Sequence, residues 1–196
     1  MSNRLLATAL HAAAGFAAIV AASLPGSAAA KTYKRCYDPQ GRPVAVHASA
    51  KVKMSNVAVA GRTKDGRPFI AYNPEALKRF HPLTRIYIYY HECAHHRLGH
   101  SSGFRPRNRE NAADCFAIRY MTRRGMLNAD RIRIIMADVQ RFGGGDQVHL
   151  PGAQRAQLIA KCYRFALTRM ARLGRGDQRP DGFSAYAGTL PGGFAG

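Results

Sequence analysis

Five consecutive residues, His91-Glu92-Cys93-Ala94-His95, have the types and spacing needed for metal chemistry. Side chains four positions apart on a helix lie on one face, about 40° apart around the axis, so both histidines can bind one metal ion. Glu92, beside the first histidine, can reach a water molecule on that ion. Cys93 lies about 200° from His91 around the helix and points away, so it is a poor ligand.

A second pair of residues with the same spacing follows on the next predicted helix. Glu110 and Asp114 are again four apart, and Glu110 comes fifteen residues after His95, which leaves room for a loop and a hairpin of two helices. A catalytic zinc ion takes three protein ligands and a water molecule, and two histidines with a glutamate are a known set. We therefore predict His91, His95 and Glu110 as Zn²⁺ ligands, with Asp114 accepting a hydrogen bond from the outward nitrogen of His91.

The chemistry that this set allows is metal-assisted hydrolysis of an amide. Zinc lowers the pKa of its water towards about 7 and polarises a carbonyl group. Glu92 would take the proton of the water and deliver it to the leaving amine. Aspartate at this position would be too short, and glutamine could not accept the proton.

The elements that must position these residues predict an α+β fold, with a small antiparallel β-sheet on the N-terminal side packed against a mainly helical core. Apolar, β-branched runs predict strands at residues 43–47, 52–60 and 68–72, with a hairpin loop between the last two. Caps and apolar periodicity predict helices at residues 73–80, 83–98, 108–124, 129–141 and 151–172.

The pattern His91-Glu92-x-x-His95 followed by Glu110-x-x-Ala113-Asp114 resembles the gluzincin zinc metallopeptidases, and in particular their HtpX and CAAX-protease-like branch. The resemblance covers about residues 68–160 and implies a zincin-like core, peptide or protein substrates, and the ligand, base and Asp114 roles given above. It also implies that the strand at residues 68–72 is a sheet edge on which an extended peptide docks. A metzincin would need glycine and histidine where the chain has Leu98 and Ser101.

Hydrolysis also needs a group that stabilises the developing oxyanion. The stretch from His149 to Arg155 resembles a His-Pro and Arg region of the same branch, which implies His149, Arg155 or Tyr163 for this role. The alternative for His149 is a residue that only caps or precedes the helix starting at Pro151. His96 and His100 lie on another face, with no acid between them, and are interpreted as surface or packing residues.

The four cysteines, Cys36, Cys93, Cys115 and Cys162, suggest two disulfides in an exported chain, with three possible pairings. Cys115 follows Asp114 on the partner helix, so a Cys93–Cys115 bond would join the two metal-bearing helices. Cys36–Cys162 would then join the ends of the domain. This pairing is one expectation among the three.

Residues 1–30 have the pattern of a secretory signal peptide, with Arg4, an apolar run from Leu5 to Leu24 and Ala28-Ala29-Ala30 as a cleavage site. The alternative is an uncleaved membrane anchor. The mature chain would begin at Lys31, with one metallopeptidase domain at residues 31–172 and a disordered tail rich in Gly, Pro and Arg at residues 173–196. The expected location is periplasmic or extracellular, with no integral membrane span after cleavage.

The chain is strongly basic. Without Arg4, 29 basic residues stand against 11 acidic ones, which gives the mature chain a net charge of +18. The basic residues are scattered and no nucleic-acid-binding module is visible, so we expect an anionic envelope surface as partner, with nucleic acid disfavoured. Three hypotheses follow: an exported zinc peptidase, a cationic envelope-binding protein whose metal site is structural or inactive, and a zinc amidase that acts on cell-wall peptides.

Overall fold

The computed structural model describes residues 36–101 and 107–174. They fall within one unit of the chain, which begins at Lys31. The predicted signal peptide or anchor, most of the loop after Ser101 and the tail beyond Gly174 lie outside the described residues. Of the described helices, none is both long and apolar enough to cross a bilayer.

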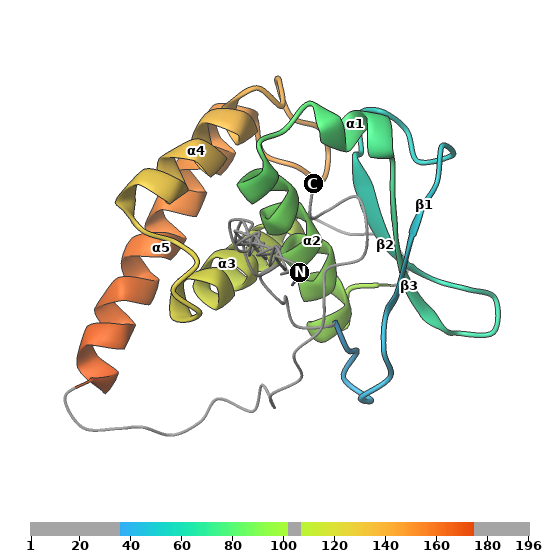
Figure 1. The fold of residues 1–196 in the computed structure, drawn as a ribbon, viewed down its shortest axis with the longest axis horizontal. Coiled ribbons are helices and arrows are strands. Elements are labelled where there is room, and N and C mark those ends of the chain that lie inside the picture. Colours follow the sequence, from blue (N-terminus) through green and yellow to red (C-terminus); the bar gives the residue numbers. More distant parts are fainter. Residues whose placement is uncertain (1–35, 102–106, 175–196) are drawn as a thin grey trace, which may run out of the picture. The chain divides into compact units, whose positions relative to one another are not determined.

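The α+β class is confirmed, with a sheet of three strands and five helices (Figure 1). The strands are β1 (Ala45–Ala48), β2 (Ala58–Arg62) and β3 (Pro68–Tyr72), in the order β1-β3-β2. β2 is antiparallel to β3, as predicted for a hairpin, but β1 is parallel to β3, so the prediction of a wholly antiparallel sheet was wrong. The chain reverses twice between β1 and β3, and the β2–β3 hairpin places β3 in the middle, beside a strand of the same direction.

The second strand begins later than its apolar run predicted. Residues 52–57 form turns, and β2 starts at Ala58. Val52 is nevertheless buried, so the apolar run contributes to the core without forming strand. Val57 has a φ of +57°, a left-handed conformation that a β-branched residue rarely adopts. This strained residue leads directly into β2, and the backbone N–H of Asn73 donates to its carbonyl oxygen at 2.8 Å.

All five predicted helices are present, with ends that differ from the predicted ones by at most two residues. Asn73 caps the first helix and Asn128 the fourth, each with its side-chain oxygen accepting backbone N–H groups, as expected for N-caps. The last helix extends one residue into the segment predicted as tail. The bounds are α1 (Pro74–Lys78), α2 (Pro82–Arg97), α3 (Arg107–Arg123), α4 (Ala129–Gln140) and α5 (Gly152–Leu173).

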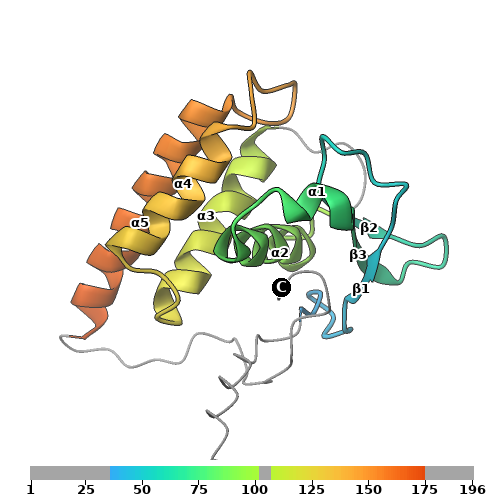
Figure 2. The same cartoon turned by 45° about the horizontal axis from the view of Figure 1, so that its top comes forward.

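Helix α2 lies between the sheet and the other long helices (Figure 1), and Figure 2 shows α3, α4 and α5 together on its far side. The helix is buried on almost every side: Thr84 and all residues from Ile86 to His96 are buried. The core on its two sides includes Ile70 of the sheet and Ile118 and Ile135 of the helices. A helix that packs on every side has little freedom to rotate or slide, and α2 therefore holds its histidines in a fixed orientation.

The disulfides join Cys36 to Cys93 and Cys115 to Cys162, so the expected Cys93–Cys115 and Cys36–Cys162 pairing was wrong. Cys93 does point away from the metal face of α2, as predicted, but it faces the N-terminal segment and not α3. Cys115 is one residue beyond Asp114, about 100° further around α3, and this rotation turns it towards α5. Each bond therefore fixes a helix that carries site residues to a different neighbour.

Candidate metal centre

Three buried side chains converge where α2 passes the first turn of α3. His91 and His95 come from successive turns of α2, and Glu110 comes from α3. Nε2 of His91 lies 3.1 Å from Nε2 of His95 and 3.1 Å from Oε2 of Glu110. Nε2 of His95 lies 3.3 Å from the same oxygen. The structure thus brings together the three residues that the sequence predicted as metal ligands.

These three separations fit a zinc ion. Ligand atoms bound at about 2.0–2.1 Å in a tetrahedral arrangement lie about 3.3–3.4 Å from one another. The measured values are 3.1, 3.1 and 3.3 Å, so one ion can contact all three atoms with only small adjustments. Two imidazole nitrogens and a carboxylate are also a donor set that zinc accepts. Within the described part of the chain, no other group of His, Cys, Asp or Glu residues meets the geometric test for a metal site.

A buried ion-pair network holds His91 from behind. Nδ1 of His91 lies 2.7 Å from Oδ1 of Asp114, which confirms the predicted contact. Arg155 of α5 binds Asp114 through both carboxylate oxygens, Nε to Oδ2 at 2.8 Å and Nη2 to Oδ1 at 2.7 Å. The hydroxyl of Tyr87 donates a further hydrogen bond to Asp114. The carboxylate of Asp114 therefore accepts hydrogen bonds from both Arg155 and Tyr87, and the ring orientation of His91 is fixed.

Charge and burial act in opposite directions on this network. Burial lowers the pKa of His91, but the charge of Asp114 and hydrogen bonds to Asp114 and Glu110 outweigh burial and raise the pKa to about 9. Burial would raise the pKa of Asp114, yet the charges of Arg155 and His91 hold it well below its usual value. The pKa of Glu110 is likewise lowered, against burial, by its hydrogen bonds to His149, His91 and His95. Both carboxylates are therefore ionised, as metal binding requires.

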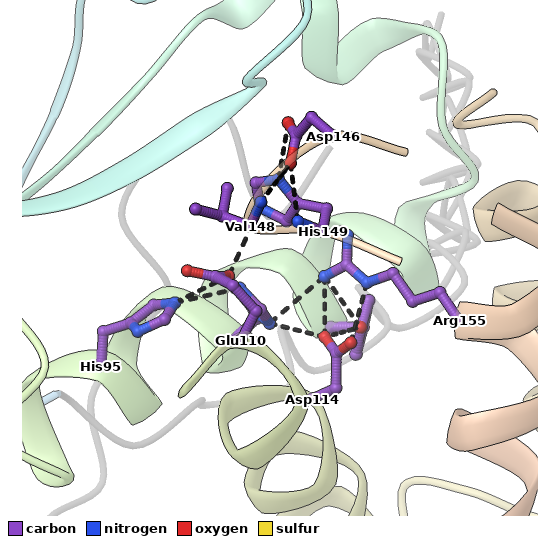
Figure 3. Close-up of polar contacts among 9 residues, drawn as sticks. His95, Glu110, Asp114, Asp146, Val148, His149 and Arg155 are labelled. Atoms are coloured by element: carbon purple, nitrogen blue, oxygen red, sulfur yellow. Dashed lines mark hydrogen bonds and ion pairs between the residues drawn. The ribbon is translucent and has the colours of Figure 1, made fainter. Parts of the chain in front are cut away.

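His149 approaches the same centre from the loop between α4 and α5 (Figure 3). Its Nε2 lies 3.4 Å from Oε2 of Glu110, and its Nδ1 lies 3.1 Å from Oδ2 of Asp146. The backbone N–H of His149 also donates to Oδ1 of Asp146 at 2.6 Å. The hydrogen bond to Glu110 raises the pKa of His149, burial opposes it, and the bond to Asp146 adds to the increase. The ring of His149 thus lies between the carboxylates of Asp146 and Glu110, beside the metal position.

A tight turn holds this loop in place. Gly145 has a φ of +79°, and a Cβ atom there would lie 2.6 Å from the backbone nitrogen of Pro151 and 2.8 Å from the carbonyl oxygen of His149. Only glycine satisfies both the conformation and the close approach. The glycine run at residues 143–145 therefore allows the chain to return on itself and bring His149 to the centre.

Two of the three ligands, His91 and Glu110, line a cavity of about 390 Å³. Glu92 lines this cavity together with His91 and Glu110. Ala58 and Val59 of β2 form part of another wall. β2 is an edge strand and β3 is the central strand, so the expectation that residues 68–72 form the docking edge was wrong. The edge beside the metal centre is β2.

Three other residues considered from the sequence are Arg155, Tyr163 and His96. The guanidinium of Arg155 donates hydrogen bonds to Asp114 and Tyr87. It therefore supports His91 and does not bind an oxyanion. Tyr163 packs at the border of the core. His96 is a packing residue, fully buried, with Nε2 2.9 Å from the carbonyl oxygen of Phe69. Sequence reasoning missed two residues, Asp146 and Tyr87; the spacing of Asp146 and His149 was the only available signal for the first.

No family model, no curated protein and no solved structure matches this chain. The chemistry of the site must therefore be argued from its own residues.

Proposed function

We propose that this protein is a zinc-dependent peptidase of the gluzincin type. One observation carries the proposal: His91, His95 and Glu110 converge as three ligands, and His91 and Glu110 line one cavity together with Glu92. Catalytic zinc has three protein ligands and an open position, whereas a structural site has a closed shell of four. In the part of the chain that the structure describes, three side chains, His91, His95 and Glu110, bring their ligand atoms together at this centre. This count favours a catalytic site over a site that only braces two helices.

Each residue around the metal position then has a task. His91, His95 and Glu110 would hold a zinc ion, which when bound would supply Lewis acidity to the scissile carbonyl and to a water molecule. Glu92 takes a proton from the attacking water and gives it to the leaving amine. His149, oriented by Asp146, would donate a hydrogen bond to the developing oxyanion. Asp114 keeps the ring of His91 in the orientation that directs Nε2 to the metal.

The substrate is an extended peptide that pairs with β2. An edge strand presents unpaired backbone groups, and peptides add to such edges by β-augmentation. Ala58 and Val59 line the cavity, so a peptide paired with them would pass the metal position. The apolar walls formed by Ile88, Phe142 and Leu150 suit apolar side chains of that peptide.

Export of the protein is part of the proposal. All four cysteines are paired in two disulfides, and disulfides persist in oxidising compartments such as the periplasm or the extracellular space. The signal-peptide pattern of residues 1–30 agrees with this location. Peptides or proteins of the cell envelope are then the available substrates.

The decisive experiment compares two substitutions of glutamate by glutamine. Glu92→Gln keeps the shape of the residue but removes the proton acceptor, and we expect hydrolysis of a peptide library to fall by about 10²–10⁴-fold. Zinc content should stay at one ion per chain. Glu75→Gln is the matched control, because Glu75 is exposed on α1 and pairs with Lys78; it should leave both quantities unchanged.

A third variant separates metal binding from catalysis. Glu110→Ala removes one ligand, so the purified protein should lose its zinc, measured by atomic emission, and its activity together. Full cleavage by Glu92→Gln would refute the mechanism. Full zinc occupancy in Glu110→Ala would refute the ligand set, and absence of chelator-sensitive cleavage by the zinc-loaded wild type would refute the enzyme itself.

A further inference from the structure

The C-terminal halves of α3 and α5 lie side by side and form a surface away from the metal centre. Two contacts, Asp114 with Arg155 and Cys115 with Cys162, and the electrostatic effect of Arg169 on Arg119 follow the same order along both helices. The two helices therefore run in the same direction. We call the surface at their C-terminal ends the cationic face; its residues are Arg119, Arg123, Lys161, Phe165, Arg169 and Arg172.

Positive charge is concentrated on this face. Burial lowers the pKa of Arg119, and the positive charges of Arg123 and Arg169 lower it further, so both of these side chains lie close enough to Arg119 to repel its charge. Helix α5 contains no acidic residue, and the two carboxylates of α3, Glu110 and Asp114, are buried in the metal centre. Neither helix thus offers a surface carboxylate to balance these cations. Such an arrangement favours an anionic partner.

An apolar residue lies in the middle of the charges. Lys161, Phe165, Arg169 and Arg172 follow one another at spacings of four, four and three, which places them on one side of α5. Phe165 is 56% exposed, the most exposed large apolar side chain in the described part of the chain. Every residue from Leu167 to Arg172 is also exposed, so these turns of α5 are accessible from several sides. A phenylalanine among Lys and Arg on a helix is the composition of an element that lies at a membrane interface.

We propose that the cationic face docks on the surface of a bilayer that contains anionic phospholipids. The lipid phosphates would neutralise the Arg and Lys side chains, and Phe165 would enter the boundary between headgroups and acyl chains. A nucleic acid would satisfy the charges but would leave the central phenylalanine without an apolar environment. The bilayer offers both environments.

The cationic face and the metal centre lie at different places along α5. Arg155, which belongs to the network of the centre, and Arg169 are fourteen residues apart, which corresponds to about 21 Å along the helix axis. This inference goes beyond the proposed peptidase and does not depend on it.

The test measures binding of the chain from Lys31, the compact unit that holds every described element, to lipid vesicles by sedimentation. Vesicles of equal parts phosphatidylglycerol and phosphatidylcholine are compared with pure phosphatidylcholine at about 0.1 M salt. We expect binding to the anionic vesicles, at least tenfold weaker binding to the neutral ones, and a strong decrease at high salt.

Two pairs of variants assign the surface. The substitutions Lys161→Gln, Arg169→Gln and Arg172→Gln together should weaken binding about 100-fold, since each basic residue near an anionic surface contributes roughly fivefold. The matched control removes three exposed lysines of the N-terminal half, Lys51, Lys53 and Lys64, and should change binding far less. Phe165→Ser should weaken binding several-fold, whereas Leu167→Ser, exposed on another side of α5, should not.

Several results would overturn the proposal: equal binding to both kinds of vesicle, wild-type binding by the triple α5 variant, an equal loss in the lysine control, or a preference for duplex DNA over anionic vesicles at the same salt. Melting curves check that each variant is folded; if the triple variant is not, Phe165→Ser and the salt titration decide. Cleavage of a soluble peptide should be the same in wild type and triple variant. Failure of the peptidase proposal would leave these binding results unaffected.

Discussion

Replacing Asp114 by asparagine tests the network behind His91 most directly. The side chains of Asp114 and Arg155 are 1% and 11% exposed, so their ion pair is almost completely removed from water. Loss of one partner of a buried pair leaves the other charge uncompensated and costs about 3–5 kcal/mol. Tyr87 and the remaining amide oxygen still contact the guanidinium, which favours the lower end. About 3 kcal/mol corresponds to a fall in Tm of roughly 6–12 °C for a chain of this size.

The same substitution should weaken zinc binding. The contact between Nδ1 of His91 and Oδ1 of Asp114 orients the ring, and loss of such a partner typically weakens metal affinity 10- to 100-fold. Calorimetric titration with zinc measures this change, and thermal melting of the metal-free protein measures stability. Both measurements use the same preparations.

Asp130→Asn is the matched control. The Asp130–Arg133 pair on α4 has the same chemistry but side-chain exposures of 79% and 69%, so its loss should cost less than about 1 kcal/mol. It should also leave zinc affinity unchanged. Equal effects of Asp114→Asn and Asp130→Asn on stability would refute the reasoning from burial.

A double variant separates the two roles of the network. Asp114→Leu combined with Arg155→Met replaces the buried pair by apolar groups, which is often neutral for stability. Stability should therefore recover relative to Asp114→Asn, while zinc affinity should stay low because leucine cannot orient His91. Recovery of zinc affinity in the double variant would show that the carboxylate has no orienting role.

Two further predictions concern the pH and the disulfides. Because the pKa of His91 is raised to about 9, the metal-free ring carries a proton at pH 7 that zinc must displace. Zinc affinity should therefore rise about tenfold per pH unit from pH 7 towards pH 9 and then level off, with one proton released per ion at neutral pH. A flat profile of zinc affinity over this range would contradict the prediction. The Cys36–Cys93 bond closes a separation of 57 residues, so Cys36→Ser with Cys93→Ser should lower the free energy of unfolding by about 4 kcal/mol, measured in denaturant, whereas an unchanged midpoint would show that the bond does not constrain the unfolded chain.

The sequence alone determined the parts of the site that depend on local geometry. A spacing of four residues on a helix places His91 with His95, and Glu110 with Asp114, on common faces, wherever the helices lie. Caps such as Asn73 and Asn128 act within three residues, so the starts of their helices were also predictable. The same local rule showed that Cys93 turns away from the metal.

Contacts between distant segments were decided only by the tertiary structure. The apolar run at residues 68–72 is compatible with an edge strand and with a central strand. Its central position depends on where β1 pairs. Cysteine pairing depends on which helices meet, and α3 turns Cys115 to α5, where Cys162 lies. From the sequence alone, Arg155 could have faced a substrate. Because α5 packs against α3, Arg155 instead binds Asp114. Local geometry sets which side chains share a face, whereas packing sets what that face meets.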